Sequence, residues 1–312
     1  MKTLKLRIVT LLALLPLATG AVFADTDYGY SRMFVFGASF LDSGNNFAVT
    51  GETAHPPFVP MSFTSYGIGG HHYSNGRTWV EVMAQAMDLT EWAKPAYRDP
   101  AYGNYAYGFA RARDVAYATG PSLGEQVQDW IDNGWCTGIP MDDTLFVLDT
   151  SYYDFADILA GENPEIVIGG MLESIATNIG ILYGCGARNL LAANAPPLGT
   201  SPMIPDTEKD AATGLTWQYN VYVQDILNFF AAEPFNMNIS TFDIFTFMTT
   251  VISAKEAFGL TNVTDTCVTF GVLKDAYCHN RDEYFFWDFL HPTKKVHALM
   301  AEAALGQLPV PE

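Results

Sequence analysis

Two segments of this sequence carry residue types that together could perform nucleophilic catalysis. The first, FVFGASFLDSGNN, spans residues 34–46 and holds Ser39 where an apolar run meets a turn-like stretch. The second, YFFWDFLHPTKKVH, holds Asp288 and His291 three residues apart, a spacing that a helical turn or tight loop brings to one side of the backbone. A serine hydroxyl becomes an effective nucleophile when a histidine accepts its proton and a carboxylate orients that histidine. These residue types therefore suit acyl transfer.

Each segment alone also has a structural explanation. Serine is common in turns because its hydroxyl makes local hydrogen bonds. An Asp-x-x-His pair arises by chance or from the capping of a helix N-terminus. Only the joint occurrence of Ser39, Asp288 and His291 in one framework favours catalysis over these alternatives.

The elements around these residues alternate between short apolar runs and helix-length amphipathic segments. This alternation predicts an α/β fold: a three-layer, doubly wound, flavodoxin-like and mostly parallel sheet of about five strands. Ligands of such folds bind at the carboxyl ends of the strands. Ser39 lies at the carboxyl end of the first predicted strand. Buried strands are predicted at residues 33–39, 144–149, 189–196 and 240–246. Helices are predicted at residues 77–89, 121–134, 164–186 and 216–233, and from Pro292 onward. The helix predicted at 121–134 carries the capping pair Ser122 and Glu125.

Five blocks, in order, resemble the GDSL esterases and lipases, also called SGNH hydrolases, over residues 33–305. FVFGASFLDSGNN is similar to FGDSLxDxGN, YSNGRTWVEVMA to SNGR-x-W, and SLGEQVQDWI to SLxxQV. NLLAANAPPLGTSP is similar to N-x-PPLG-x-xP, and YFFWDFLHPTKKVH to FWDxxHPTxxxH. The resemblance implies an SGNH-type fold and hydrolysis of an ester through an acyl-enzyme, without a cofactor. It assigns Ser39 as nucleophile, His291 as general base and then acid, and Asp288 as the group that orients His291.

The resemblance also implies an oxyanion site, where the chain departs from the family pattern. Ala38 replaces the aspartate of the GDS triplet, and Phe109 in NYAYGFAR stands where a glycine N–H is expected. TSYYDF follows the second predicted strand where the family has Gly-x-Asn-Asp, and we expect Ser151 at the asparagine position. The expected oxyanion donors are Ser39, Phe109 and Ser151. Three further residues are candidates for the substrate cleft: Asn45, Asn104 and Trp287.

The first 24 residues have the pattern of a signal peptide. Lys2, Lys5 and Arg7 precede an apolar run that is shorter than the roughly 20 residues a membrane span needs, and small residues follow up to Ala24. We therefore predict a signal peptide at residues 1–24 and a single hydrolase domain at 25–312. The mature protein is expected to be secreted and to have no integral membrane segment.

Four cysteines are consistent with disulfide bonds in an oxidising compartment. Sequence alone allows three connectivities, of which we expect Cys267–Cys278 with Cys136–Cys185. The cysteines and histidines lack zinc-ligand spacing, and no metal is predicted.

The chain is strongly acidic, with 16 basic and 34 acidic residues and a formal net charge of −18. This charge argues against nucleic acid or an anionic membrane as partner. The partner that the resemblance implies is an ester substrate. Two Asn-x-Ser/Thr triplets, at Asn238 and Asn262, are candidate glycosylation sites.

These features predict a secreted serine esterase, with acetyl or short-chain acyl groups on carbohydrate as its expected substrate. One alternative is a lipid acyl hydrolase. Another is a degenerate relative that binds a glycan, lipid or partner protein without turnover, because several oxyanion positions differ from the family pattern.

Overall fold

The computed structural model of the chain describes residues 27–50, 71–116, 118, 120–272 and 274–310. The predicted signal peptide, residues 1–24, lies outside these ranges and stays a prediction. The centre of the fold is a four-stranded sheet whose neighbouring strands are all parallel, in the order β1-β2-β3-β4. The strands are β1 (Arg32–Phe36), β2 (Thr144–Asp149), β3 (Asn189–Ala193) and β4 (Asn238–Phe242).

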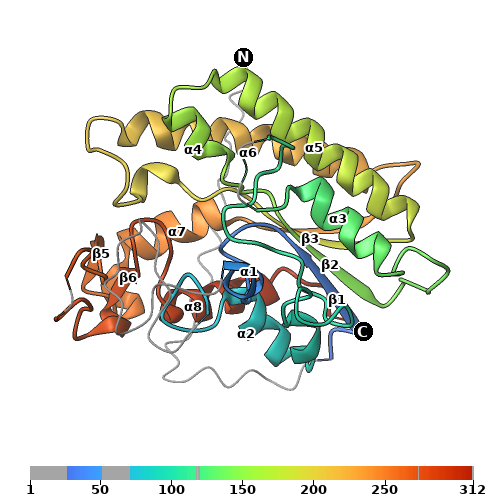
Figure 1. The fold of residues 1–312 in the computed structure, drawn as a ribbon, viewed down its shortest axis with the longest axis horizontal. Helices are drawn as coiled ribbons and strands as arrows, with labels where there is room; N and C mark the ends of the chain where they lie inside the picture. The colour runs from blue at the N-terminus through green and yellow to red at the C-terminus, as the bar shows by residue number, and fades with distance from the viewer. Residues whose placement is uncertain (1–26, 51–70, 117, 119, 273, 311–312) are drawn as a thin grey trace, which may run out of the picture.

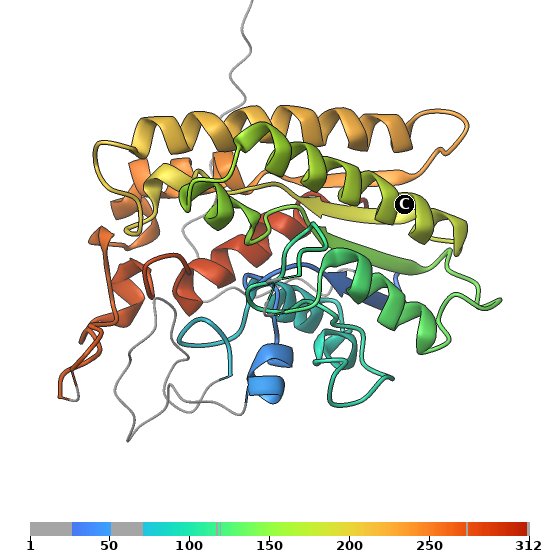
Figure 2. The same ribbon diagram turned by 45° about the horizontal axis from the view of Figure 1, so that its top comes forward.

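Helices cover both faces of this sheet because alternate strand residues point to opposite sides and both sides are apolar. Phe34 and Phe146 belong to one core with α3, α5 and α6, whereas Val35 and Val147 belong to a second core with α2, α7 and α8. Figures 1 and 2 show the two helical layers with the sheet between them. The predicted three-layer α/β architecture is therefore confirmed.

The α-helices are α1 (Asn45–Thr50), α2 (Trp79–Ala86), α3 (Leu123–Asp132), α4 (Asp154–Leu159), α5 (Pro164–Gly184), α6 (Lys209–Ala231), α7 (Ile244–Ser253) and α8 (Lys294–Leu305). The 3₁₀ turns are η1 (Thr90–Ala93), η2 (Leu198–Thr200), η3 (Lys255–Phe258) and η4 (Arg281–Glu283).

The number of strands differs from the expected five at the edge of the sheet next to β1. The described residues form four strands in this sheet, and the fifth position is taken by an irregular extended segment around Asn104. Val35 N–H donates to the Gly103 carbonyl (2.9 Å), and Tyr105 N–H donates to the Val35 carbonyl (2.8 Å). Tyr107 N–H continues this parallel pattern by donating to the Gly37 carbonyl (3.1 Å). The segment does not become a regular strand because the Gly37 N–H donates to the Gln126 side chain instead (2.9 Å).

Helix caps explain where two predicted elements differ from the structure. The run predicted as a strand over 240–246 leaves the sheet at Phe242, because the Asp243 carboxylate accepts the Thr246 N–H (3.0 Å) and starts α7. The last helix begins at Lys294 rather than at Pro292, with Thr293 as its N-cap residue. By contrast, the predicted capping pair of α3 is present as a reciprocal box between Ser122 and Glu125.

Both predicted disulfides are present. Cys136–Cys185 joins the segment after α3 to the end of α5. Cys267–Cys278 lies in a small lobe built on a two-stranded parallel sheet of β5 (Asn262–Thr266) and β6 (Tyr284–Phe286). This lobe carries the chain into the segment with Asp288 and His291.

Among the described residues, α5 is the one helix long and apolar enough to cross a membrane. Val167, Met171 and Ile175 on this helix are buried in the core against the sheet. Core helices of soluble proteins have the same composition, so its hydropathy is weak evidence for a span.

Candidate active site

Ser39 lies in a tight turn at the carboxyl end of β1. The turn is closed by the N–H groups of Leu41 and Asp42, which both donate to the Ala38 carbonyl (3.1 Å each). The Gln126 side chain of α3 holds the residue before the turn from both sides. It accepts the Gly37 N–H (2.9 Å) and donates to the Gly37 carbonyl (3.0 Å). Together these bonds fix the direction in which Ser39 leaves the sheet.

Asp288 and His291 lie in a tight loop after β6, and the loop is folded by the carboxylate itself. Asp288 Oδ1 accepts the N–H groups of Leu290 (2.9 Å) and His291 (2.7 Å). Trp287 N–H donates to the His291 carbonyl (2.7 Å) and closes the loop from the other side. The three-residue spacing seen in the sequence therefore forms a loop that turns both side chains the same way.

The structure brings Ser39, His291 and Asp288 into one hydrogen-bonded chain. His291 Nε2 lies 2.7 Å from Ser39 Oγ, and His291 Nδ1 lies 2.9 Å from both carboxylate oxygens of Asp288. His291 and Asp288 are both buried. With Nδ1 protonated and donating to Asp288, Nε2 is left to accept the serine proton, which is the arrangement that nucleophilic catalysis requires.

Aromatic rings surround the imidazole and limit the positions it can take. Tyr73 stacks on His291 with ring centroids 5.2 Å apart, and Phe40 packs against it at 5.6 Å. Trp287, predicted in the substrate cleft, is fully buried and stacks on Tyr277 (5.3 Å) in the disulfide-linked lobe. Trp287 therefore does not line the cavity as predicted. Its ring is enclosed by the disulfide-linked lobe, where it supports the loop that carries Asp288.

Asn45 and Asn104 are also displaced from the role predicted for them. Both are fully buried. Asn45 Nδ2 donates to the carbonyls of Asn104 and Ala106 (2.8 Å each), and Asn104 Nδ2 donates to the Leu41 carbonyl (2.8 Å). Their amides join the turn after Ser39 to the edge segment of the sheet, so these residues are structural supports and do not line a substrate cleft.

The backbone N–H groups of Ser39 and Phe109, both expected as oxyanion donors, have no hydrogen-bond acceptor in the part of the chain that the structure describes. Phe109 has a left-handed backbone (φ +63°), a conformation that favours glycine, and this explains why a glycine is expected there. Its ring lies between those of Tyr73 (5.6 Å) and Tyr153 (5.2 Å). Packing of this ring offsets the strain of the backbone.

Asp42 holds the loop that carries Phe109. One carboxylate oxygen accepts the N–H of Gly108 (2.8 Å), and the other accepts those of Gly44 (2.8 Å) and Asn45 (2.7 Å). Burial raises the pKa of Asp42, and these N–H donors oppose that rise. The sequence contained the signal for this role, since Asp42 is the one charged residue in FVFGASFLDSGNN.

Ser151 lies beside Ser39 on the wall of a cavity, but the register of its block needs correction. In SYYD, Asp154 matches the final aspartate of Gly-x-Asn-Asp, which puts Ser151 at the glycine and Tyr153 at the asparagine. Ser151 N–H donates to Asp149 Oδ1 (2.8 Å), so this N–H is already used inside the protein. The asparagine donor of the family pattern is therefore replaced by an aromatic residue.

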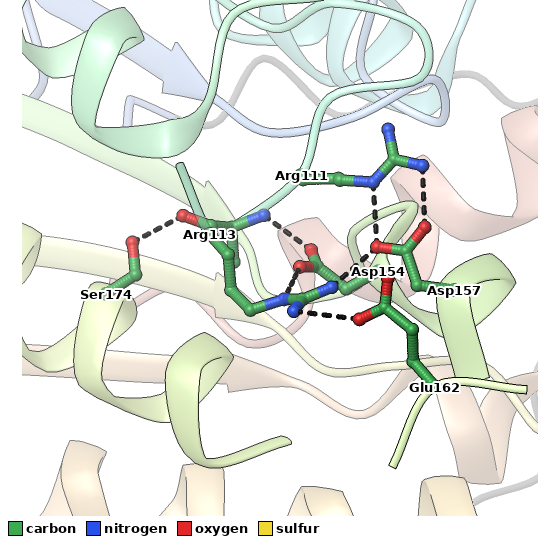
Figure 3. Close-up of polar contacts among 7 residues, drawn as sticks. Arg111, Arg113, Asp154, Asp157, Glu162 and Ser174 are labelled. Atoms are coloured by element: carbon green, nitrogen blue, oxygen red, sulfur yellow. Dashed lines mark hydrogen bonds and ion pairs between the residues drawn. The ribbon is translucent and has the colours of Figure 1, made fainter. Parts of the chain in front are cut away.

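Buried ion pairs attach the segment after Phe109 to α4 and the turn that follows it (Figure 3). Arg111 makes two bonds to Asp157, from Nε (2.9 Å) and from a terminal nitrogen (2.7 Å). Arg113 donates to Asp154 (2.7 Å), Asp157 (2.6 Å) and Glu162 (3.3 Å). All of these side chains except Glu162 are largely buried, so the network acts as a clamp in a region of low dielectric constant.

Backbone bonds complete the same clamp. Tyr153 N–H donates to the Ala110 carbonyl (2.9 Å), and Ala112 N–H donates to Asp154 Oδ2 (2.6 Å). Ser174 Oγ of α5 donates to the Ala112 carbonyl (2.5 Å). The position of Phe109 is thereby tied to α4, which forms one wall of the cavity beside Ser39.

That cavity is mainly apolar and has about 50 Å³ of accessible volume. Its lining includes Ser39 and Ser151 together with Phe155, Ala156 and Leu159 of α4. A water molecule needs about 10–15 Å³ on this measure, so the accessible space suits a chain of about three to five heavy atoms. The arrangement matches a nucleophile next to a small acyl-binding site.

Two more buried titratable groups lie close to the site, and sequence reasoning missed both. Burial raises the pKa of Asp149 to about 7, with the N–H groups of Ser151 and Ala38 opposing the rise. Burial, followed by the nearby His291 and His72, lowers the pKa of His297 to about 3. His297 is therefore neutral at physiological pH, and its Nδ1 accepts the Trp79 N–H (3.2 Å). Among the described residues there is no cluster of three or more His, Cys, Asp or Glu side chains suited to a metal ion.

Comparisons with known proteins agree with this geometry. The family GDSL-like Lipase/Acylhydrolase matches residues 33–304. The chain is 24% identical to "GDSL esterase/lipase 6" of Arabidopsis thaliana, over 94% of this chain and 91% of that protein. It is 25% identical to "Thermolabile hemolysin" of Vibrio parahaemolyticus, over 88% of this chain and 63% of that protein.

Proposed function

Because this chain belongs to the GDSL-like lipase/acylhydrolase family, whose relatives are esterases and lipases, we propose that it is a secreted serine esterase that cleaves short-chain carboxylic esters. The observation that carries the proposal is the 2.7 Å contact between Ser39 Oγ and His291 Nε2, with Asp288 on the opposite ring nitrogen. The predicted signal peptide and the two disulfides support secretion.

In the proposed reaction, Ser39 Oγ attacks the ester carbonyl as its proton passes to His291 Nε2. Asp288 accepts from Nδ1 and stabilises the imidazolium that forms. His291 then returns the proton to the leaving alcohol, and an acyl-enzyme remains on Ser39. Water, activated by the same imidazole, hydrolyses this intermediate and releases the carboxylic acid.

The oxyanion would be held by the backbone N–H groups of Ser39 and Phe109, which have no acceptor among the described residues. Tyr153 stands in place of the asparagine whose side chain the family pattern adds. Loss of one such donor costs about 100 to 1000-fold in turnover, so we expect a slower enzyme than one with a complete set. Nucleophile and base are unaffected by this change.

The apolar cavity supports an acyl group of acetyl to butyryl size, because its accessible volume of about 50 Å³ is small. The leaving alcohol would lie on the open side, where a carbohydrate is the expected carrier. In the lipid acyl hydrolase alternative, a longer acyl chain would extend out of the cavity. A series of p-nitrophenyl esters from acetate to palmitate separates the two, since a short-chain esterase loses activity beyond about four carbons.

The decisive experiment uses a fluorophosphonate probe, which reacts with activated serines and does not require the natural substrate. We expect the wild-type protein to be labelled and the Ser39→Ala variant to remain unlabelled. Ser240 on β4, a partly buried serine outside the site whose hydroxyl donates to the Gln307 carbonyl (2.9 Å), gives the matched control Ser240→Ala, which should retain labelling. Absence of labelling of folded wild-type protein, together with no ester cleaved above the Ser39→Ala background, would support the degenerate binding protein instead.

A further inference from the structure

Asp149 is a buried carboxylate at the carboxyl end of β2, and the reaction proposed above does not use it. Only 2% of the residue is exposed. Its backbone neighbour across the sheet is Gly37, where an added Cβ would lie 2.6 Å from the Asp149 Cβ. Asp149 therefore packs directly under the turn that carries Ser39.

The carboxylate of Asp149 joins two segments of the candidate site. One oxygen accepts the Ser151 N–H (2.8 Å), and the Ala38 N–H lies near enough to the carboxylate to oppose the rise in its pKa. Ala38 directly precedes Ser39, and Ser151 lies on the wall of the cavity. The Asp149 side chain thus lies between the turn that carries Ser39 and the segment after β2.

No cation accounts for this buried charge among the residues that the structure describes around it. From α3 it meets the neutral amide of Gln126, which bonds Gly37 on the same turn. From α6 the nearest titratable group is Tyr219, whose hydroxyl donates to the Thr150 carbonyl (2.6 Å). Tyr152 on its own segment is also near. The two N–H groups are the main compensation for the charge.

We propose that ionised Asp149 is a positioning residue, which aligns Ser39 for attack by accepting the Ser151 N–H and attracting the Ala38 N–H from beneath the turn. The proposal rests on the esterase function above. Protonation removes the negative charge and turns one oxygen into an O–H donor, so the carboxyl attracts both N–H groups less strongly and holds the turn less firmly. Burial holds the pKa of this carboxyl at about 7, and the change therefore falls within the working range of the enzyme.

The test compares wild type with Asp149→Asn, because an amide copies the shape and the neutral state of the protonated acid. The measured quantity is kcat/KM for p-nitrophenyl acetate between pH 5 and pH 9. At pH 8.5 we expect wild type to exceed Asp149→Asn by about tenfold, the usual effect of one charge-assisted hydrogen bond. Near pH 5.5 the ratio should approach one, since both proteins then carry a neutral group.

Two further measurements keep the outcome clear. Asp129 on α3 also has a pKa raised by burial but lies outside the site, so Asp129→Asn should follow wild type at every pH. In wild type alone, log kcat/KM should fall more steeply than in Asp149→Asn as the pH drops through 7, because the tenfold loss from protonation of Asp149 adds to the effect of protonating the base. Circular dichroism at each pH confirms that the variants are folded.

A ratio of wild type to Asp149→Asn that stays constant with pH would overturn the inference, as would acid limbs of equal steepness in the two proteins. Both results leave the esterase itself intact. Failure of the esterase proposal has a different signature, namely wild-type protein that neither reacts with fluorophosphonate nor hydrolyses the acetate.

Discussion

The clamp between the segment after Phe109 and α4 depends on Asp157. Removal of the Asp157 carboxylate therefore gives a specific prediction for the free energy of unfolding. Asp157 accepts both bonds that join it to Arg111 and a third from Arg113. The side chains of Asp157, Arg111 and Arg113 are 6%, 9% and 12% exposed, so the charges are poorly solvated. Asp157→Ala removes the carboxylate that the two guanidinium groups share, while Arg113 keeps Asp154 and Glu162.

Removing one partner from a buried ion pair costs about 3–5 kcal/mol, because the remaining charge loses its counter-charge without regaining water. We expect this loss in the free energy of unfolding for Asp157→Ala, measured by urea titration with tryptophan fluorescence at pH 7 and intact disulfides. Replacing both partners, in Arg111→Met with Asp157→Ala, removes the isolated charge. The double variant should therefore be more stable than the sum of the two single losses by about 1–3 kcal/mol.

The exposed pair between Glu91 and Lys94 gives the matched control. Glu91→Gln should leave the urea midpoint within error, because exposed ion pairs contribute little. If Asp157→Ala costs less than about 1 kcal/mol, or if the single losses add without coupling, the clamp does not hold the segment as the contacts indicate. Activity gives a second measure, since a displaced Phe109 N–H should lower kcat more than it raises KM.

Three further predictions concern pH, acyl length and the disulfide lobe. Burial lowers the pKa of His297 to about 3, so between pH 3 and 6.5 the unfolded chain binds a proton that the folded protein excludes, and stability rises with pH. Between pH 4.5 and pH 7, the free energy of unfolding measured by urea titration should increase by about 3 kcal/mol less in His297→Gln than in wild type. An equal increase in both proteins would contradict a neutral buried imidazole. Ala156→Phe narrows the cavity and should lower kcat/KM for butyrate relative to acetate by about tenfold in an ester series, whereas an equal effect on both would place the acyl chain elsewhere. Cys267→Ser with Cys278→Ser removes a cross-link between residues 11 apart and should cost about 3 kcal/mol by urea titration; a loss below about 1 kcal/mol would show that the lobe holds together without it.

The sequence and the structure agree on features that depend on local pattern. The strand of residues 144–149 and the capping box of α3 were predicted with the bounds and partners that the structure has. Strands buried on both faces are continuous apolar runs, and a capping box is a reciprocal bond within four residues, so neither needs the rest of the fold to be recognised.

The predictions that failed concern which side of a buried surface a residue faces. Asn45 and Asn104 are polar and belong to the blocks of the site, but each of their amides is satisfied by backbone groups of a neighbouring segment. Phe242 ends a strand that apolar pattern alone would extend, because Asp243 caps a helix instead. Such outcomes depend on partners many residues away.

The amino-acid sequence by itself determined the family, the α/β class, and the nucleophile, base and orienting residues as candidates, because each lies in a short block with its own residue spacing. Only the tertiary structure decided that Ser39 and His291, 252 residues apart in the chain, meet at 2.7 Å. It alone also decided that Asp149 lies buried under the turn that carries Ser39, and that Arg111 and Arg113 join the segment after Phe109 to α4. The physical reason is that burial and the pKa of a carboxyl depend on the elements packed around it, which local sequence spacing does not specify.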